Sequence, residues 1–382
     1  MSGKTVIYGA GKAGEWMLDE WNRKMQGTEI SGILDAFSPK KSIRNVPVYR
    51  PDDYMARYGR ETETVVITAG RQKAVSEMVK VCRRNEIPNI YMLHDIPGKR
   101  KMPLIESEQF LPHRIRRIRF SFSRPTLPYV ELPIINACNL NCKGCLFLCN
   151  PKGDCTSVPA AMVIRDLERM KELFEDIPWI RILGGEPLMH EELGEILLAV
   201  RRIFDDSEID VCTNGLLLPK LGQQMYQLFR EQRIVVHISG YDPVFRMQEE
   251  IETVLQREGI PHCFLERSDF SKFYSLSDSN DKDYNFQNCF TCACHELYQG
   301  KLSMCSGVIA FDKMNQQFHT AYQLEEGKDY YDIHAKDFDA FHVMELLERP
   351  IPACRYCDMA KMQSFSWGTA GNHARLKDYI VD

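Results

Sequence analysis

Residues 129–145 read YVELPIINACNLNCKGC, and this stretch decides the fold of the central part of the chain. Its first half, YVELPIIN, is rich in apolar and β-branched residues and predicts a buried strand. Its second half places Cys138, Cys142 and Cys145 in the spacing C-x3-C-x2-C, directly after that strand. Three thiolates can hold three irons of a [4Fe–4S] cluster and leave the fourth iron open for a ligand. A closed zinc or iron–sulfur knuckle is the alternative, because Cys149 offers a fourth thiol.

Strand and helix patterns alternate from residue 129 to about residue 266. The predicted strands are 129–136, 179–185, 209–215, 233–239 and 261–266. Between them, apolar residues recur at helical spacing, as in Leu167, Met170 and Phe174. Alternating β and α elements predict a parallel sheet. Five strands and an expected sixth give a partial (β/α)6 barrel, in which chemistry gathers where the strands end and the loops begin.

Polar turns follow three of these strands. The second strand ends in Gly184-Gly185-Glu186-Pro187, where glycines allow close backbone approach and a carboxylate complements an ammonium group. The third strand ends in Thr213-Asn214-Gly215, and the fourth ends in Ser239. Each turn alone also fits an ordinary strand-to-helix connection. Their order after the cysteine triad favours a ligand site.

Together, these motifs resemble the radical S-adenosylmethionine (SAM) superfamily over residues 129–266. The resemblance implies that the open iron binds the amino and carboxylate groups of SAM. Electron transfer then breaks a C–S bond and yields methionine and a 5′-deoxyadenosyl radical. It also implies that the GGEP turn receives the methionyl ammonium, that Thr213 and Asn214 lie near the adenosine, and that Ser239 bonds the ribose. The family often has an aromatic residue just before the third cysteine, where this chain has Gly144.

A second group of cysteines lies in the C-terminal part, where residues 289–305 read CFTCACHELYQGKLSMC. Gly300 permits a hairpin turn that brings flanking cysteines together, and a C-x2-C pair follows about fifty residues later. This pattern resembles the twitch domain, a shortened auxiliary-cluster domain of SPASM-type radical SAM enzymes. The resemblance implies a second [4Fe–4S] cluster on four thiolates, those of Cys294, Cys305, Cys354 and Cys357. Cys289 and Cys292 are extra and either could replace Cys294; a structural zinc site is the alternative.

Residues 1–95 also alternate strand and helix, with strands predicted at 5–11, 29–35, 64–70 and 89–93. Gly9, Gly11 and Gly14 have the G-x-G-x-x-G spacing that lets a phosphate approach a helix N-terminus. Asp35 ends the second strand, where a carboxylate often binds ribose hydroxyls. The segment resembles the small Rossmann-like domain of sugar acyltransferases and surface-polysaccharide enzymes. That resemblance implies nucleotide or nucleotide-sugar binding; a domain used only for docking is the alternative.

Composition and charge fit a globular protein of several domains. The chain has 382 residues, 44% of them hydrophobic, and a net charge of −5, which gives no reason to expect nucleic-acid binding. Its first residues predict a strand and not a signal peptide, and no apolar run is long enough to span a bilayer, so we expect a cytoplasmic location. We predict four regions: a Rossmann-like domain at 1–95, a basic linker at 96–128, the partial barrel at 129–270 and a small Cys-rich auxiliary domain at 271–382. The linker alternatively forms a docking strip for a phosphate or an acidic partner.

Together, these predictions describe an α/β enzyme whose reaction begins with hydrogen abstraction. The outcome of the reaction could be epimerisation, dehydration or oxidation. The N-terminal domain favours a small polar substrate, such as a nucleotide-linked sugar or a surface-glycan precursor. A flavodoxin- or ferredoxin-type protein is the expected electron donor. Candidate proton or hydrogen donors are Tyr241, Cys289, Cys292 and His295. Three alternatives remain: a peptide-modifying maturase, a non-catalytic iron–sulfur or zinc scaffold, and an NAD-dependent oxidoreductase built on residues 1–95.

Overall fold

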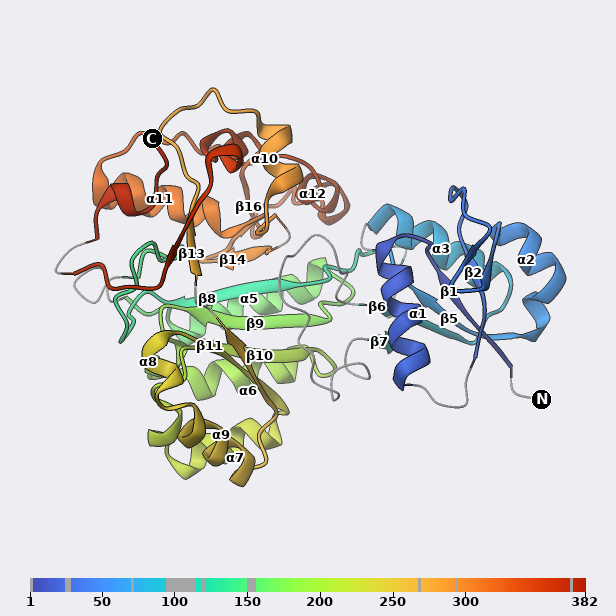
Figure 1. Ribbon diagram of the computed structural model, residues 1–382, viewed down its shortest axis with the longest axis horizontal. Coiled ribbons are helices and arrows are strands. Elements are labelled where there is room, and N and C mark those ends of the chain that lie inside the picture. Colours follow the sequence, from blue (N-terminus) through green and yellow to red (C-terminus); the bar gives the residue numbers. More distant parts are fainter. Residues whose placement is uncertain are drawn as a thin grey trace. The chain divides into compact units, whose positions relative to one another are not determined.

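The computed structural model describes residues 3–24, 29–69, 72–93, 115–117, 121, 123–149, 156–266, 269–292, 294–371 and 374–382. Contacts divide the chain into two compact units, Met1–Pro128 and Tyr129–Asp382. Each unit contains its own large sheet (Figure 1). Both sheets are built mainly from parallel strands alternating with helices, so the predicted α/β class is confirmed.

The sheet of the first unit has the strand order β3-β4-β2-β1-β5-β6-β7. Its strands are β1 Lys4–Tyr8, β2 Ile30–Leu34, β3 Ser42–Ile43, β4 Val46–Tyr49, β5 Thr62–Ile67, β6 Asn89–Leu93 and β7 Ile115–Arg117. The connecting helices are α1 Lys12–Lys24, α2 Pro51–Tyr58 and α3 Gln72–Arg84. The four predicted strands are confirmed. β7 comes from the segment expected to be a linker, and it pairs antiparallel with β6.

The central strands of this unit are buried on both faces, as parallel strands between helices are. Val6 and Val65 belong to one apolar core, and Ile7 and Val66, their neighbours along β1 and β5, belong to another. Since side chains alternate along a strand, the two cores lie on opposite faces of the sheet.

The sheet of the second unit has the order β12-β11-β10-β9-β8-β14-β15-β16. Its parallel strands are β8 Val130–Ile135, β9 Trp179–Gly184, β10 Glu208–Thr213, β11 Ile234–Gly240 and β12 His262–Glu266. The helices between them are α5 Ala160–Leu173, α6 Leu193–Ile203, α7 Gln223–Glu231, α8 Asp242–Phe245 and α9 Gln248–Arg257. All five strands predicted for residues 129–266 are confirmed.

The expected sixth parallel strand does not extend the series beyond β12 in the described residues. The next strand, β13 Asp269–Lys272, instead pairs antiparallel with β17 Gln363–Ser366 in a separate two-stranded sheet. On the opposite edge, β8 is joined by β14 Glu296–Tyr298, which continues into β15 Lys301–Ser303 and β16 Tyr330–Asp332. The large sheet therefore grows on its β8 side, with strands from the C-terminal part of the chain.

The C-terminal helices gather around this added hairpin (Figure 1). They are α10 Lys282–Asn288, α11 Ser306–Phe318 and α12 Ala340–Leu347. Gly300 has φ +79° in the turn between β14 and β15, a conformation that glycine adopts without the cost other residues meet. The predicted hairpin turn at Gly300 is thus confirmed.

A row of buried charged side chains crosses the parallel strands of the second unit. Glu131 of β8, Arg181 of β9 and Asp210 of β10 are paired in register, so they share one face of the sheet. The Arg181 Nη2 atom lies 2.6 Å from Asp210 Oδ2 and 3.0 Å from His237 Nδ1 on β11. All four side chains are buried. Because removing one member would leave a buried charge without its partner, the row ties these strands together.

No helix among the described residues combines the length and the apolar character that a membrane crossing requires.

Candidate functional site

The loop after β8 carries the first cysteine group, and two of its thiols accept hydrogen bonds. Cys138 Sγ accepts from the backbone N of Leu140 at 3.4 Å and from Asn214 Nδ2 at 3.9 Å. Cys142 Sγ accepts from the indole Nε1 of Trp367 at 3.2 Å. Donors aimed at sulfur stabilise thiolates, the form in which cysteine binds iron, so this donor set fits a cluster.

The three thiols lie close enough to influence one another's ionisation. Burial raises the pKa of Cys138 to about 12, and its neighbours Cys145, Glu186 and Cys142 add to the shift. Burial also raises the pKa of Cys142 to about 12, again with a contribution from Cys145. A hydrogen bond from the Cys149 thiol is the main reason that the pKa of Cys145 falls to about 6. Cys149 therefore lies beside the triad, as the closed-knuckle alternative requires.

In the described residues, no three His, Cys, Asp or Glu side chains converge as metal ligands do. The candidate ligands are therefore identified by which thiols neighbour one another and by which groups donate hydrogen bonds to them.

The GGEP turn after β9 packs directly on the backbone that leads to Cys138. Gly184 has φ +139°, and a Cβ on Gly185 would lie 2.0 Å from the carbonyl oxygen of Ala137. The backbone N of Glu186 donates to that same oxygen at 2.8 Å. Only glycine allows this approach, so the two glycines hold the turn against the cysteine loop.

Glu186 joins this turn to the loop after β10. Its side chain is completely buried, and it accepts from Thr213 Oγ1 at 2.6 Å, from Asn214 N at 2.8 Å and from Leu188 N at 3.1 Å. Burial raises the pKa of Glu186 to about 7. Since three protein donors already use this carboxylate, its expected contact with a methionyl ammonium stays a prediction.

Asn214 completes a network across the ends of three strands. Its Nδ2 donates to Asn139 Oδ1 at 2.6 Å, in the cysteine loop, while its backbone N donates to Glu186. The loops that follow β8, β9 and β10 are thus connected by hydrogen bonds at the carboxyl edge of the sheet. This is where the sequence predicted the site to lie.

A comparison of this sequence with models of known protein families agrees with this arrangement. The family model described as "Radical SAM superfamily" matches residues 132–264, which include the cysteine loop, the GGEP turn and the loop of Asn214. Residues 132–264 are thus similar to the radical SAM superfamily.

The curated relatives that match are named GTP 3′,8-cyclase. The protein of Staphylococcus carnosus (strain TM300) is 28% identical over 167 residues, covering 41% of this chain and 45% of the relative. The protein of Staphylococcus aureus (strain Mu3 / ATCC 700698) is 28% identical over 122 residues, covering 29% of this chain and 34% of the relative. The chain thus spans less than half the length of these relatives.

Solved structures that are similar include Streptococcus suis SuiB bound to S-adenosylmethionine, with 17% identity and a TM-score of 0.29 over 36% of this chain and 31% of that one. BtrN in complex with AdoMet and 2-DOIA is 12% identical, with a TM-score of 0.36 over 66% of this chain and 97% of that one.

Two further residues predicted for the radical SAM domain lie on the next strand and its turn. Ser239 is buried at the end of β11, with its Oγ 3.8 Å from Cys212 Sγ. Tyr241 stacks on Trp367, with ring centroids 6.5 Å apart, and packs against Phe270 in a tilted arrangement at 5.5 Å. The described contacts thus link Tyr241 to the cysteine loop through Trp367.

The second cysteine group surrounds a small cavity in the C-terminal part of the unit. The cysteines that line it are Cys289, Cys305, Cys354 and Cys357. Burial raises the pKa of Cys305, and the other three thiols each add to that shift, so the four lie near one another. The predicted set contained Cys294 in place of Cys289. The structure brings Cys289 to this cavity, because α10 ends at Asn288 and delivers the next residue there.

The remaining candidates of this group lie around Cys289. Cys292 Sγ donates to the carbonyl oxygen of Cys289 at 3.6 Å, and the hydrogen bond between the two thiols is the main reason that the pKa of Cys289 falls to about 6. The backbone N of Cys294 donates to Thr291 O at 2.9 Å. The carbonyl oxygen of His295 accepts from the backbone N of Glu131, which ties this segment to β8.

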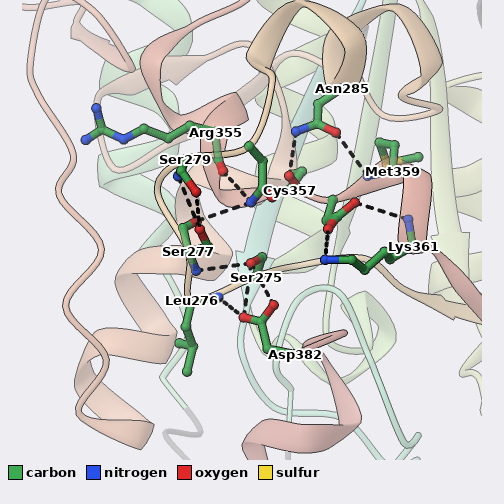
Figure 2. Close-up of polar contacts among 12 residues, drawn as sticks. Ser275, Leu276, Ser277, Ser279, Asn285, Arg355, Cys357, Met359, Lys361 and Asp382 are labelled. Carbon is green, nitrogen blue, oxygen red and sulfur yellow. Dashed lines mark hydrogen bonds and ion pairs between the residues drawn. The ribbon is translucent and has the colours of Figure 1, made fainter.

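Asn285 holds the Cys354–Cys357 turn in place (Figure 2). Its Nδ2 donates to the carbonyl oxygens of Cys354 and Cys357, and its Oδ1 accepts from Met359 N at 3.0 Å. Figure 2 also shows Asp382 accepting from Ser275 Oγ, at 2.9 Å, beside the same turn. The sequence gives no periodic signal for Asn285, because its role depends on backbone groups about seventy positions away.

A larger cavity of about 950 Å³ lies between α11 and the β14–β16 strands. Its lining is mostly polar and includes Asn136, Tyr298, Ser303 and Lys313. Lys313 Nζ donates to Asn136 Oδ1 and to the carbonyl oxygen of Phe147, each at 2.8 Å. Phe147 belongs to the cysteine loop, so Lys313 connects this cavity to that loop. Sequence analysis missed Lys313, since an isolated helical lysine is usually a solvated surface residue.

The glycine loop of the first unit is closed by its own aspartate. Gly9 has φ +128°, and a Cβ on Gly14 would lie 1.9 Å from the carbonyl oxygen of Gly9. Asp35 Oδ2 accepts from the backbone N of Ala10 at 2.8 Å, while Oδ1 accepts from two amides of its own turn. These amide hydrogen bonds outweigh burial and lower the pKa of Asp35. The predicted ribose ligand is thus engaged in holding the loop.

Proposed function

We propose that this protein is a radical SAM enzyme that uses Cys138, Cys142 and Cys145 to bind a [4Fe–4S] cluster with one open iron. The observation that carries the proposal is the hydrogen-bonded network in which Glu186 and Asn214 link the loops after β8, β9 and β10. This network lies at the carboxyl edge of a parallel sheet, where α/β enzymes place their ligands.

When bound, the reduced cluster would supply an electron that breaks a C–S bond of SAM and yields methionine and a 5′-deoxyadenosyl radical. The protein's own residues position and protect that chemistry. The glycines of the GGEP turn let the backbone approach the cysteine loop, and Glu186 fixes that turn relative to Asn214. Cys149 is buried against Cys145, and we propose that it stays a neighbour and not a fourth ligand.

We propose that Cys289, Cys305, Cys354 and Cys357 bind a second metal centre, a [4Fe–4S] cluster in preference to zinc. Four thiols around one cavity provide a complete ligand set and leave no open position. Burial raises the pKa of Cys305, Cys354 and Cys357, so a bound cation would offset the cost of the negative charge that these thiols take on when they lose their protons.

We propose that the substrate is a small polar molecule that binds in the cavity beside Lys313. The polar lining and the ammonium group suit a substrate with hydroxyl groups and a negative charge. Nucleotide-sugars are one class to test, and purine nucleoside triphosphates are another, because the curated relatives are named GTP 3′,8-cyclase. The electron would come from a flavodoxin- or ferredoxin-type protein.

The first unit is proposed to bind a nucleotide at its glycine loop, next to exposed Gly11. Addition of nucleotides should raise the unfolding temperature of the wild-type protein, and Gly11→Trp should abolish that rise by blocking the loop. No rise with any nucleotide would favour a docking role for this unit.

The proposed function is tested by anaerobic reconstitution, iron and sulfide analysis, and an assay for 5′-deoxyadenosine. The wild-type protein should cleave SAM when reduced, and Cys142→Ala should lose this activity. Cys82→Ala is the matched control, because Cys82 is a buried cysteine of the first unit. Cleavage retained by Cys142→Ala would remove the triad from its role, and no cleavage by the wild type would favour a scaffold.

A further inference from the structure

The segment that follows β17, residues 367–371, lies antiparallel along the cysteine loop. Cys142 and Thr369 form an antiparallel bridge. Backbone and side-chain hydrogen bonds flank it on both sides: Lys143 N to Gly368 O at 2.8 Å, Ala370 N to Asn141 O at 2.8 Å, and Asn141 Nδ2 to Gly371 O at 2.6 Å. The loop is thus held by a segment more than two hundred positions later in the chain.

This pairing places the indole of Trp367 on the middle cysteine. Its Nε1 donates to Cys142 Sγ at 3.2 Å. The ring is half-buried and stacks on Tyr241 with an interplanar angle of 25°. Because the ring plane and the backbone on both sides are fixed, the N–H group is aimed at the sulfur by the fold.

The loop itself leaves room for these aromatic rings. Gly144 has φ +68°, and a Cβ there would lie 2.6 Å from Phe365 Cζ and 3.1 Å from the carbonyl oxygen of Asp378. A side chain at this position would therefore meet Phe365. The position at which the resembled family often has an aromatic residue is a glycine here, and the C-terminal segment supplies the aromatic contacts instead.

We propose that Trp367 is a positioning residue that donates a hydrogen bond to the Cys142 thiolate of the cluster and thereby raises the cluster's reduction potential. The inference rests on the proposed function, since it requires Cys142 to be a ligand. Reduction adds negative charge to the cluster, and a donor on a ligating sulfur stabilises that charge. Removing the donor should make the cluster harder to reduce.

The test compares Trp367→Phe with the wild type by redox titration followed by electron paramagnetic resonance. The signal that changes when SAM is added identifies the cluster with the open iron. Trp367→Phe keeps an aromatic ring but loses the N–H group, so its midpoint potential should shift to a more negative value. Trp16→Phe is the matched control, because Trp16 lies on α1 of the other unit, and its potential should equal that of the wild type.

A second measurement needs no variant. Wild-type protein labelled with 15N in its indole rings should show a 15N coupling to the reduced SAM-binding cluster by electron–nuclear double resonance. Of the four tryptophans in the chain, only Trp367 is placed by the described contacts on a cysteine of the triad. An unchanged potential in Trp367→Phe, or no 15N coupling, overturns the inference while SAM cleavage by the wild type still supports the proposed function. Failure of the wild type to bind a cluster overturns both.

Discussion

At the scale of single residues, Glu186 shows how one buried carboxyl can connect two loops. Its pKa is raised to about 7 by burial, against 4.5 for an exposed glutamate. The folded protein therefore binds a proton more tightly than the unfolded chain does, and the resulting stabilisation is complete below pH 4.5 and is lost as the pH rises to about 7. At 1.36 kcal/mol per pKa unit, the loss amounts to roughly 3 kcal/mol.

We therefore expect Glu186→Gln to change the pH dependence of stability. The amide does not ionise, so the decline in stability between pH 4.5 and 7 should disappear. The variant should also be less stable at every pH, because an amide N–H₂ group faces the donors of Thr213 and Asn214. Urea unfolding of the metal-free proteins across this pH range measures the difference. Equal slopes in the two proteins would show that the pKa of this carboxyl is the same in the folded and unfolded states.

Residue types predicted the position of this site, but only the structure shows how its members interact. Three cysteines and a glycine-rich turn are local signals, and the structure places both after strand ends. Trp367 and Lys313 are single side chains that reach the cysteine loop from distant segments, with no motif of their own. Sequence patterns record local spacing, so contacts of this kind escape them.

At the scale of elements, Gly144 connects the cysteine loop to β17. Gly144→Ala should lower the free energy of unfolding by about 1–2 kcal/mol, because alanine at positive φ is strained and its Cβ would displace Phe365. Gly368→Ala is the matched control in the pairing segment, since a Cβ there meets no atom within 4 Å. Urea unfolding of the metal-free variants gives both values. Equal losses would mean that the loop adapts without cost.

The end of α10 decides which cysteine completes the second ligand set, because Cys289 directly follows this helix. Cys289→Ala should lose the second cluster and lower the iron content by about four atoms per chain, whereas Cys294→Ala should keep the wild-type content. Iron and sulfide analysis after reconstitution measures both variants. The reverse result would restore the set predicted from the sequence.

Elements with a clear period in their apolar residues were predictable from the sequence, and very short elements were not. The five parallel strands of the second unit follow apolar runs long enough to be recognised. In contrast, β14, β15 and β16 have three residues each, too few to display an alternation. Pro219 lies in the 3-10 turn Leu218–Lys220, and α7 begins only after Gly222, so this proline does not open the α-helix.

At the scale of the whole molecule, all proposed metal ligands belong to one of the two compact units. The cysteines of both groups lie within Tyr129–Asp382, and the glycine loop lies within Met1–Pro128. A ligand that binds only the folded form of one unit stabilises that unit by mass action. Metal binding should therefore raise the unfolding temperature of the second unit and leave that of the first unit unchanged.

Scanning calorimetry can test this separation, because two units with separate cores are expected to unfold in two transitions. Reconstitution with iron and sulfide should raise the midpoint of only one of them. Val66→Ala, which removes apolar contacts from a fully buried position in the first unit, should lower the midpoint of the other transition alone. A single transition that both changes shift together would show that the units are coupled, and nucleotide binding in one would then be able to influence the radical SAM domain in the other.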